Sequence, residues 1–320
     1  MSNDKPRVPV IALEEHYFDP EVAALFVGRD VPPHIRERIF DLNELRLREM
    51  DAAGIDVQVL SHGAPAVQRL DAATAVPVAR KANDKLKATI DAHPTRFAGF
   101  ATLPTADPQA AADELERCVT KLGFKGAMVH GLCNGVFFDD QRFWPICERA
   151  AALDVPLYMH PAQPHPAVVE AYYKDYAAEF PSLVSAGWGF TVETATQGIR
   201  LVLSGVFDAH PGLKIILGHL GEGLPFSLWR IDLGLSRDGK RPLAFRETFR
   251  EHFWITTSGN FSTPALLCSM MELGIDRILF SVDYPFVMNA PGTKWLDELQ
   301  LATEDKHKLM SGNARRLLRM

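Results

Sequence analysis

Five of the eleven histidines in this chain stand at, or one residue before, the carboxyl end of a short apolar run. Such runs are typical of buried β-strands, and these five contain His16, His62, His130, His160 and His219. Two further runs end in polar groups near Asn260 and Asp283. In a parallel α/β barrel, every strand directs its carboxyl end to one face, where side chains from distant parts of the chain meet. The pattern therefore predicts both a barrel and a functional site on one of its faces.

Strand-like runs alternate with helical patterns from end to end, which argues for βαβ units around a parallel sheet. Eight strands are predicted, at residues 8–14, 57–61, 97–103, 126–130, 155–159, 213–218, 253–257 and 278–282. Helices are predicted over 41–53 and 71–92, from an Asp107 cap to Lys121, and from a Ser262 or Thr263 cap to Leu273.

The 320 residues suit one (β/α)8 TIM barrel over residues 1–320, although length alone would also allow two domains. No Ser/Gly-rich linker divides the chain. The segments 17–40 and 162–192 are too long to be simple connections. Because both follow predicted strands, we expect them to be insertions that overhang the carboxyl-terminal face of the barrel.

Composition restricts the partners of this chain. The formal net charge is −6, and charges of both signs are interspersed, which argues against a nucleic-acid partner. No apolar stretch reaches the roughly 18 residues that a membrane span needs, and the start of the chain lacks a signal-peptide pattern. A cytoplasmic protein that acts on small molecules, without a membrane partner, is expected.

Four residues at predicted strand ends could hold a metal ion. Glu14 and His16 are two positions apart, so in a strand they project to the same side. His160 follows a buried strand pattern, and Asp283 follows the last strand, which lies beside the first once a barrel closes. Two carboxylates with two imidazoles suit Zn²⁺ or Mn²⁺ better than Mg²⁺, because imidazole is a borderline ligand.

Further candidates surround this set. His219 stands three residues before Glu222, a spacing at which a carboxylate can orient an imidazole for acid–base chemistry. Alternatively, Glu222 only stabilises the amino end of a helix. Arg230 could clamp a substrate carboxylate or bind a structural acid. His62 and His130 could line the pocket or make buried structural hydrogen bonds.

Several segments together resemble the decarboxylase branch of the amidohydrolase superfamily, which includes γ-resorcylate and 2,3-dihydroxybenzoate decarboxylases. They are IALEEH, SHGAPAVQ, VPLYMHP, GHLGEGLPF, WRID, ITTSGN, ILFSVDYPF and NARRLL, in order and over nearly the whole chain. The resemblance implies a (β/α)8 barrel with one divalent ion, zinc or manganese, on Glu14, His16, His160 and Asp283. It also implies a homodimer or homotetramer.

The activity implied by the resemblance is decarboxylation of a hydroxylated aromatic acid, with Asp283 as proton donor if the site raises its pKa. His219 and Glu222 would hold or ionise the phenol, and Arg230 would assist charge balance. The chain departs from the family pattern at His62 and His130, so we expect a different preference for ring substituents. Two alternatives remain: a hydrolase or hydratase of the same superfamily, and a barrel that binds a ligand without catalysis.

Overall fold

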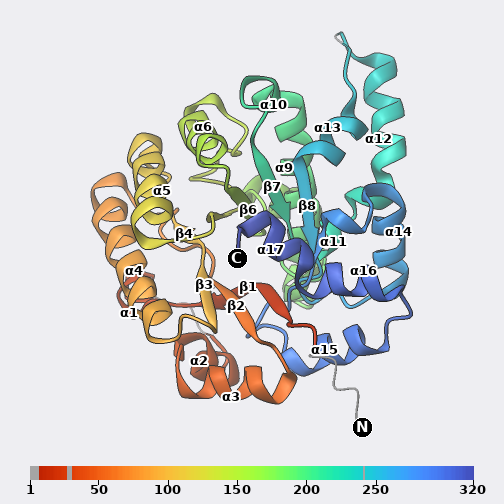
Figure 1. Cartoon of the computed structure of the whole chain (residues 1–320). Coiled ribbons are helices and arrows are strands. Elements are labelled where there is room, and N and C mark those ends of the chain that lie inside the picture. Colours follow the sequence, from red (N-terminus) through yellow and green to blue (C-terminus); the bar gives the residue numbers. More distant parts are fainter. Residues whose placement is uncertain (1–6, 27–30, 241) are drawn as a thin grey trace.

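The computed structural model describes residues 7–26, 31–240 and 242–320. Its strands are β1 Ile11–Tyr17, β2 Val57–His62, β3 Phe97–Gly99, β4 Ala101–Thr102, β5 Ala127–His130, β6 Pro156–His160, β7 Lys214–Leu217, β8 Phe253–Thr256 and β9 Ile278–Leu279. All neighbouring strands pair in parallel, in the orders β1-β2-β3 and β4-β5-β6-β7-β8-β9. The strands occupy the middle of the molecule, with helices around them (Figure 1).

Two junctions join these strands into a closed ring. At the first, a parallel bridge between Leu13 and Ser281 connects the end of the last strand to β1. At the second, the Phe100 amide donates to the carbonyl of Leu60, and the Ala101 amide donates to that of Gly126. β3 and β4 therefore share one position in the ring, so the single strand predicted over 97–103 is interrupted at Phe100. The predicted (β/α)8 barrel is confirmed.

Helices cover the outside of the ring. They are α1 Pro20–Ala24, α2 Pro33–Phe40, α3 Glu44–Ala53, α4 Ala72–Ala92, α5 Pro108–Leu122, α6 Trp144–Leu153, α7 Pro166–Val168, α8 Lys174–Ala177, α9 Gly189–Ser204, α10 Val206–Ala209, α12 Leu224–Asp238, α13 Phe245–His252, α14 Thr263–Leu273, α15 Asn289–Glu298, α16 Thr303–His307 and α17 Asn313–Leu318. Short 3-10 or π turns lie at Gln141–Phe143, Val169–Tyr173, Pro181–Val184, Ile275–Arg277 and Lys308–Gly312. No helix among the described residues combines the length and apolar character that crossing a membrane requires.

Local signals place several of these helices where the sequence predicts them. The Asp107 side chain accepts from the amide of Ala110 at the start of α5, and Gly123 ends that helix with a φ of 76°. Because a left-handed conformation costs glycine little, this is the usual way to stop a helix. Ser262 precedes α14 as predicted, but its side chain makes no capping hydrogen bond.

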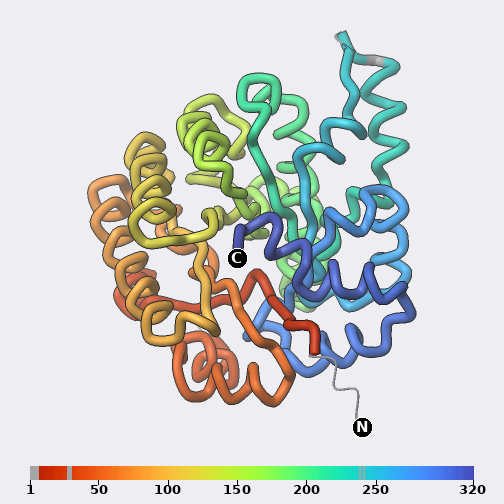
Figure 2. Tube along the Cα trace, in the orientation of Figure 1, coloured from red at the N-terminus to blue at the C-terminus, as the bar shows by residue number. Residues whose placement is uncertain are grey.

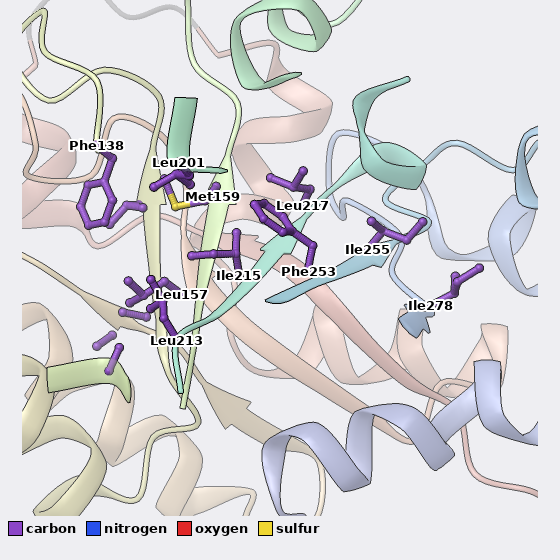
Figure 3. Close-up of a cluster of buried hydrophobic side chains, with 14 of the residues drawn as sticks. Phe138, Leu157, Met159, Leu201, Leu213, Ile215, Leu217, Phe253, Ile255 and Ile278 are labelled. Atoms are coloured by element: carbon purple, nitrogen blue, oxygen red, sulfur yellow. The ribbon is translucent and has the colours of Figure 1, made fainter. Parts of the chain in front are cut away.

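Successive side chains of each strand point to opposite sides of the barrel wall. They form one core between strands and helices and another inside the barrel. Leu157 and Met159 of β6 pack outward with Ile215 and Leu217 of β7, against helix residues such as Leu201 (Figure 3). The residues between them face the barrel interior, where the cluster is Ile11, Leu13, Val59, Ala98, Phe100, Met128, Tyr158, Ile216 and Leu279 with Ala314, Leu317 and Leu318.

The last three of these interior residues belong to α17, which covers the amino-terminal mouth of the barrel. The carboxyl end of the chain lies near the centre of the ring in the same orientation (Figure 2). Because one mouth is filled, the carboxyl ends of the strands form the face that is open to ligands.

Candidate metal and catalytic site

Glu14, His16, His160 and Asp283 come together at the carboxyl ends of the strands. One ligand atom from each lies within 4.8 Å of the others. Nε2 of His16 is 3.4 Å from Oδ1 of Asp283, and Nε2 of His160 is 3.4 Å from Oε1 of Glu14. The first three side chains are buried, and that of Asp283 is 16% exposed. The structure thus assembles the four residues that the sequence singled out.

A bulge in β1 directs the first two of these residues inward. Ile11 and Leu13 pack in the barrel interior, so strict alternation would turn Glu15 inward and Glu14 outward. Instead Glu14 has a φ of 59°, and the pairing with β2 shifts between Ala12 and Glu15. Glu14 and His16 share a face, as the sequence predicts, and the irregularity turns that face toward the barrel interior.

Glu15 points to the opposite side of the strand, into a buried polar network. Its carboxylate accepts from the amide of Val282 at 2.9 Å and from the Gln58 side chain at 3.2 Å. Gln58 in turn accepts from Arg46, which also donates to the carbonyl of His16 at 2.5 Å. Burial raises the pKa of Glu15 to about 8, although the Val282 amide and the charge of Arg46 oppose the shift. This network holds β1 at the bulge.

The oxygens of Glu14 have different environments. Oε2 accepts from the hydroxyls of Tyr158 and Ser258. Oε1 has no hydrogen-bond partner, nor do Nε2 of His16 and Oδ1 of Asp283, although all three atoms are buried. Buried polar atoms without partners are costly, and these three converge on one point. Carboxylate oxygens and imidazole nitrogens together fit a divalent transition metal, so the donor set fits the metal that the sequence predicts.

Sequence reasoning missed Tyr158 and Ser258, although a signal for the tyrosine exists. Tyr158 stands two residues before His160 in β6, so both side chains face the barrel interior. Ser258 follows β8, where its hydroxyl also lies 3.1 Å from that of Ser281. These hydroxyls fix the Glu14 carboxylate so that only one oxygen is available to a ligand.

His219 and Glu222 lie next to the cluster on a left-handed turn. The five residues from His219 to Gly223 all have positive φ, so α11 (His219–Glu222) is not a right-handed helix. The turn places Nδ1 of His219 2.7 Å from Oε1 of Glu222. Nε2 of His219 lies 3.9 Å from Oε1 of Glu14 and 4.0 Å from Oδ2 of Asp283. This geometry supports the acid–base interpretation over the alternative in which Glu222 only stabilises a helix end.

The pKa values of His219 and Asp283 are shifted in opposite directions. Burial lowers the pKa of His219, but the carboxylates of Glu222 and Glu14 outweigh it and bring that pKa well above its ordinary value. For Asp283, burial raises the pKa, but the neighbouring imidazoles of His16 and His219 outweigh it and leave that pKa below its ordinary value. The raised pKa expected of Asp283 as a proton donor is therefore not found.

A cavity of about 340 Å³ opens beside these groups. Its lining includes Ala186, Phe190, Thr191, His219, Glu222, Ser258, Gly259, Asn260, Asp283 and Val287. The first three lie within the predicted insertion 162–192, so this segment overhangs the site as expected. The volume suits a small ligand.

The other predicted insertion, 17–40, includes residues 27–30, which lie outside the described residues. Its described part borders a second cavity of about 400 Å³, lined mainly by apolar side chains of α1 and α2 and by His62. Nε2 of His62 accepts from the amide of Asp19 at 3.0 Å, and its Nδ1 faces the carbonyl of Gly63 at 2.9 Å. Both ring nitrogens thus bond backbone groups while the ring lines this cavity, and substrate contact by His62 stays a prediction.

His130 and Arg230 also lie away from the residues that line the cavity beside His219. His130 is buried against His160, with their Nδ1 atoms 3.1 Å apart. Burial lowers the pKa of His130, as do His160 and His16, while a hydrogen bond to the backbone of His62 acts the other way. Arg230 is exposed on α12. Substrate contact by these residues stays a prediction.

Comparison with known proteins gives a consistent result. The family model described as amidohydrolase matches residues 16–320. The gamma-resorcylate decarboxylase of a Polaromonas species is 43% identical, over 97% of this chain and 98% of its own. A 2,6-dihydroxybenzoate decarboxylase crystallised with 2,6-dihydroxybenzoate superposes with a TM-score of 0.90 at 41% identity, covering 98% of this chain and 100% of its own.

A dihydroxybenzoic acid decarboxylase from Polaromonas, solved with manganese and the inhibitor 2-nitroresorcinol, gives a TM-score of 0.89 at 41% identity, over 98% of this chain and 97% of its own. The relatives match almost the whole chain, and the family model begins at His16. This chain belongs to the amidohydrolase family, in the branch that contains the gamma-resorcylate decarboxylases.

Proposed function

We propose that this protein is a metal-dependent, non-oxidative decarboxylase of a hydroxylated aromatic carboxylic acid of the hydroxybenzoate type. The observation that carries this proposal is the convergence of three unpartnered buried atoms, Glu14 Oε1, His16 Nε2 and Asp283 Oδ1, beside the His219–Glu222 pair. Similarity to gamma-resorcylate decarboxylases over 97% of the chain supports it.

Glu14, His16, His160 and Asp283 would hold one Mn²⁺ or Zn²⁺ ion. When bound, the ion supplies a Lewis acid for the carboxylate and the neighbouring hydroxyl of the substrate. Phe190 and Val287, which line the cavity, can pack against an aromatic ring. The cavity therefore combines apolar and polar lining groups, as a hydroxybenzoate requires.

Asp283 and His219 have separate proposed roles in proton transfer. Asp283 is the proposed donor to the ring carbon that bears the carboxylate. Protonation there interrupts aromaticity, and cleavage of the bond to the carboxylate returns its electrons to the ring and releases CO₂. Because the pKa of Asp283 is low at rest, Asp283 must first take up a proton. His219 has a raised pKa and lies 4.0 Å away, so it is the proposed source of that proton.

A homodimer or homotetramer is also proposed. Phe226 and Trp229 of α12 are 86% and 60% exposed, and Met271 of the neighbouring α14 is 84% exposed. Exposed apolar groups of this size are typical of subunit contacts. Arg230 follows Trp229, so its predicted role in balancing substrate charge would be exercised across such a contact. Light scattering on the purified protein tests the assembly. The single domain over residues 1–320 and the cytoplasmic location stay predictions.

The test of function is CO₂ release from a panel of hydroxybenzoates by protein loaded with Mn²⁺ or Zn²⁺. We expect CO₂ from at least one acid with a hydroxyl next to the carboxylate, no CO₂ after chelation, and recovery when metal is returned. Hydrated or hydrolysed products without CO₂ would establish the hydrolase or hydratase alternative instead. No bound metal and no turnover would favour the non-catalytic barrel.

A further inference from the structure

His130 and His160 are partners across the ladder between β5 and β6, at the last position of both strands. Their rings meet at 70° with centroids 4.9 Å apart, and their Nδ1 atoms are 3.1 Å apart. At this distance one nitrogen must donate a proton and the other must accept it with a lone pair. One ring of this pair is therefore the donor and the other is the acceptor, and the rest of the site determines which is which.

The proposed ligand set fixes the donor. Nε2 of His160 faces the cluster, 3.4 Å from Oε1 of Glu14. An imidazole nitrogen that binds a metal uses its lone pair, so the proton of neutral His160 must lie on Nδ1. Nδ1 of His160 therefore donates, and Nδ1 of His130 accepts. His130 must then carry its own proton on Nε2.

The surroundings of His130 hold it in this position. Its backbone amide donates to Oε1 of Gln68 at 2.5 Å, and Nε2 of Gln68 donates back to its carbonyl at 3.4 Å. The amide of Gly131 donates to the carbonyl of His160 at 2.9 Å. The imidazole also has its hydrogen bond to the backbone of His62. With a relative exposure of 2%, His130 has little freedom to leave His160.

We propose that His130 is a positioning residue that orients the metal ligand His160 by accepting the hydrogen bond from its Nδ1. This inference rests on the proposed metal-dependent function. Metal-binding histidines commonly donate to a carboxylate, a carbonyl or water. A neutral imidazole in that place fixes the ring and tautomer without adding negative charge to a site that already holds Glu14, Asp283 and Glu222.

The test measures the dissociation constants of Mn²⁺ and Zn²⁺ by chelator competition in three variants. His130→Leu removes the acceptor, and binding should weaken about 10- to 100-fold. His130→Asn supplies Oδ1 close to the former Nδ1, so binding should recover to within about threefold of wild type. His252→Leu is the matched control. His252 is also buried, but it precedes β8 at the opposite end of the barrel, where its Nδ1 bonds the carbonyl of Leu213. Its metal affinity should not change.

Histidine ¹⁵N spectra of the zinc-loaded wild type give a second measurement. We expect the proton of His160 on Nδ1 and that of His130 on Nε2. A proton on Nδ1 of His130 overturns the proposal, and this holds even if His130→Leu fails to fold. The proposal is also overturned if His130→Leu binds Mn²⁺ and Zn²⁺ as tightly as the wild type does. It is overturned as well if His130→Asn weakens metal binding as much as His130→Leu does. If the wild type binds neither metal, the proposed function itself has failed, which is a separate result.

Discussion

Nδ1 of His219 and Oε1 of Glu222 lie 2.7 Å apart on a turn whose five residues all adopt positive φ. For residues other than glycine, a left-handed conformation costs roughly 1–2 kcal/mol each. Such strain persists where the surrounding structure imposes it, and it is frequent at functional sites. Here the turn directs the imidazole toward Asp283 while its other nitrogen remains bonded to a carboxylate.

Glu222→Gln should lower the activity and shift its pH dependence. The carboxylate of Glu222 raises the pKa of His219, so its loss lowers that pKa. Protonated His219 then disappears at a lower pH, and the alkaline limb of kcat/KM should move down by about one pH unit or more. Turnover should fall about 100-fold, within the range of general acid–base catalysis. The control Glu247→Gln, at an exposed position of α13, should leave the pH profile unchanged. An alkaline limb in Glu222→Gln identical to that of the wild type would contradict the assigned pair.

Asp283→Asn should abolish most turnover while the protein stays folded. Asparagine can neither carry the proton nor offer an anionic ligand, so kcat should fall about 1,000-fold. The measurement is CO₂ release at saturating Mn²⁺, with metal content determined on the same sample. Turnover close to wild type in a metal-loaded variant would refute the proposed role of Asp283.

Glu15→Gln should flatten the pH dependence of stability in the metal-free protein. The folded pKa of Glu15 is about 8 and its ordinary value is 4.5, so between these the folded state retains a proton that the unfolded state has lost. Stability contributed by the protonated carboxyl is therefore complete at low pH and declines as pH rises toward 8, by at most about 1.4 kcal/mol per pH unit. The free energy of unfolding in guanidinium is measured near both ends of this pH range. The difference between the two values should be smaller in the variant than in the wild type. Equal differences in the two proteins would exclude a raised pKa.

Tyr158→Phe should weaken metal binding without removing any proposed ligand. Its hydroxyl donates to Oε2 of Glu14, which leaves Oε1 directed at the cluster. Loss of such a supporting hydrogen bond typically costs about 10-fold or more in metal affinity. Chelator competition measures this, with Tyr172→Phe as control because that side chain is 72% exposed. If both variants bind Mn²⁺ as the wild type does, the hydroxyl does not support Glu14.

Much of this architecture can be predicted from sequence because it depends on local patterns. The run before His160 alternates interior and exterior apolar side chains, and such alternation is visible without coordinates. Asp107 and Gly123 mark a helix through capping and left-handed backbone, which are local properties as well. Parallel strands then bring distant strand ends to one face, so Glu14, His16, His160 and Asp283 could be grouped in advance.

The tertiary structure decided what depends on neighbours in space. The amino acids next to Glu14 in sequence do not reveal the bulge that turns its side chain inward. The bulge depends on pairing with β2 and on the hydrogen bonds that Arg46 and Glu15 make on the other side of the strand. Likewise, His62 and His130 look equivalent in sequence. Only the fold shows that the ring nitrogens of His62 bond backbone groups, whereas His130 contacts a proposed metal ligand. The sequence by itself determined which residues reach the active face; the packing around each one determined which atoms remain available there.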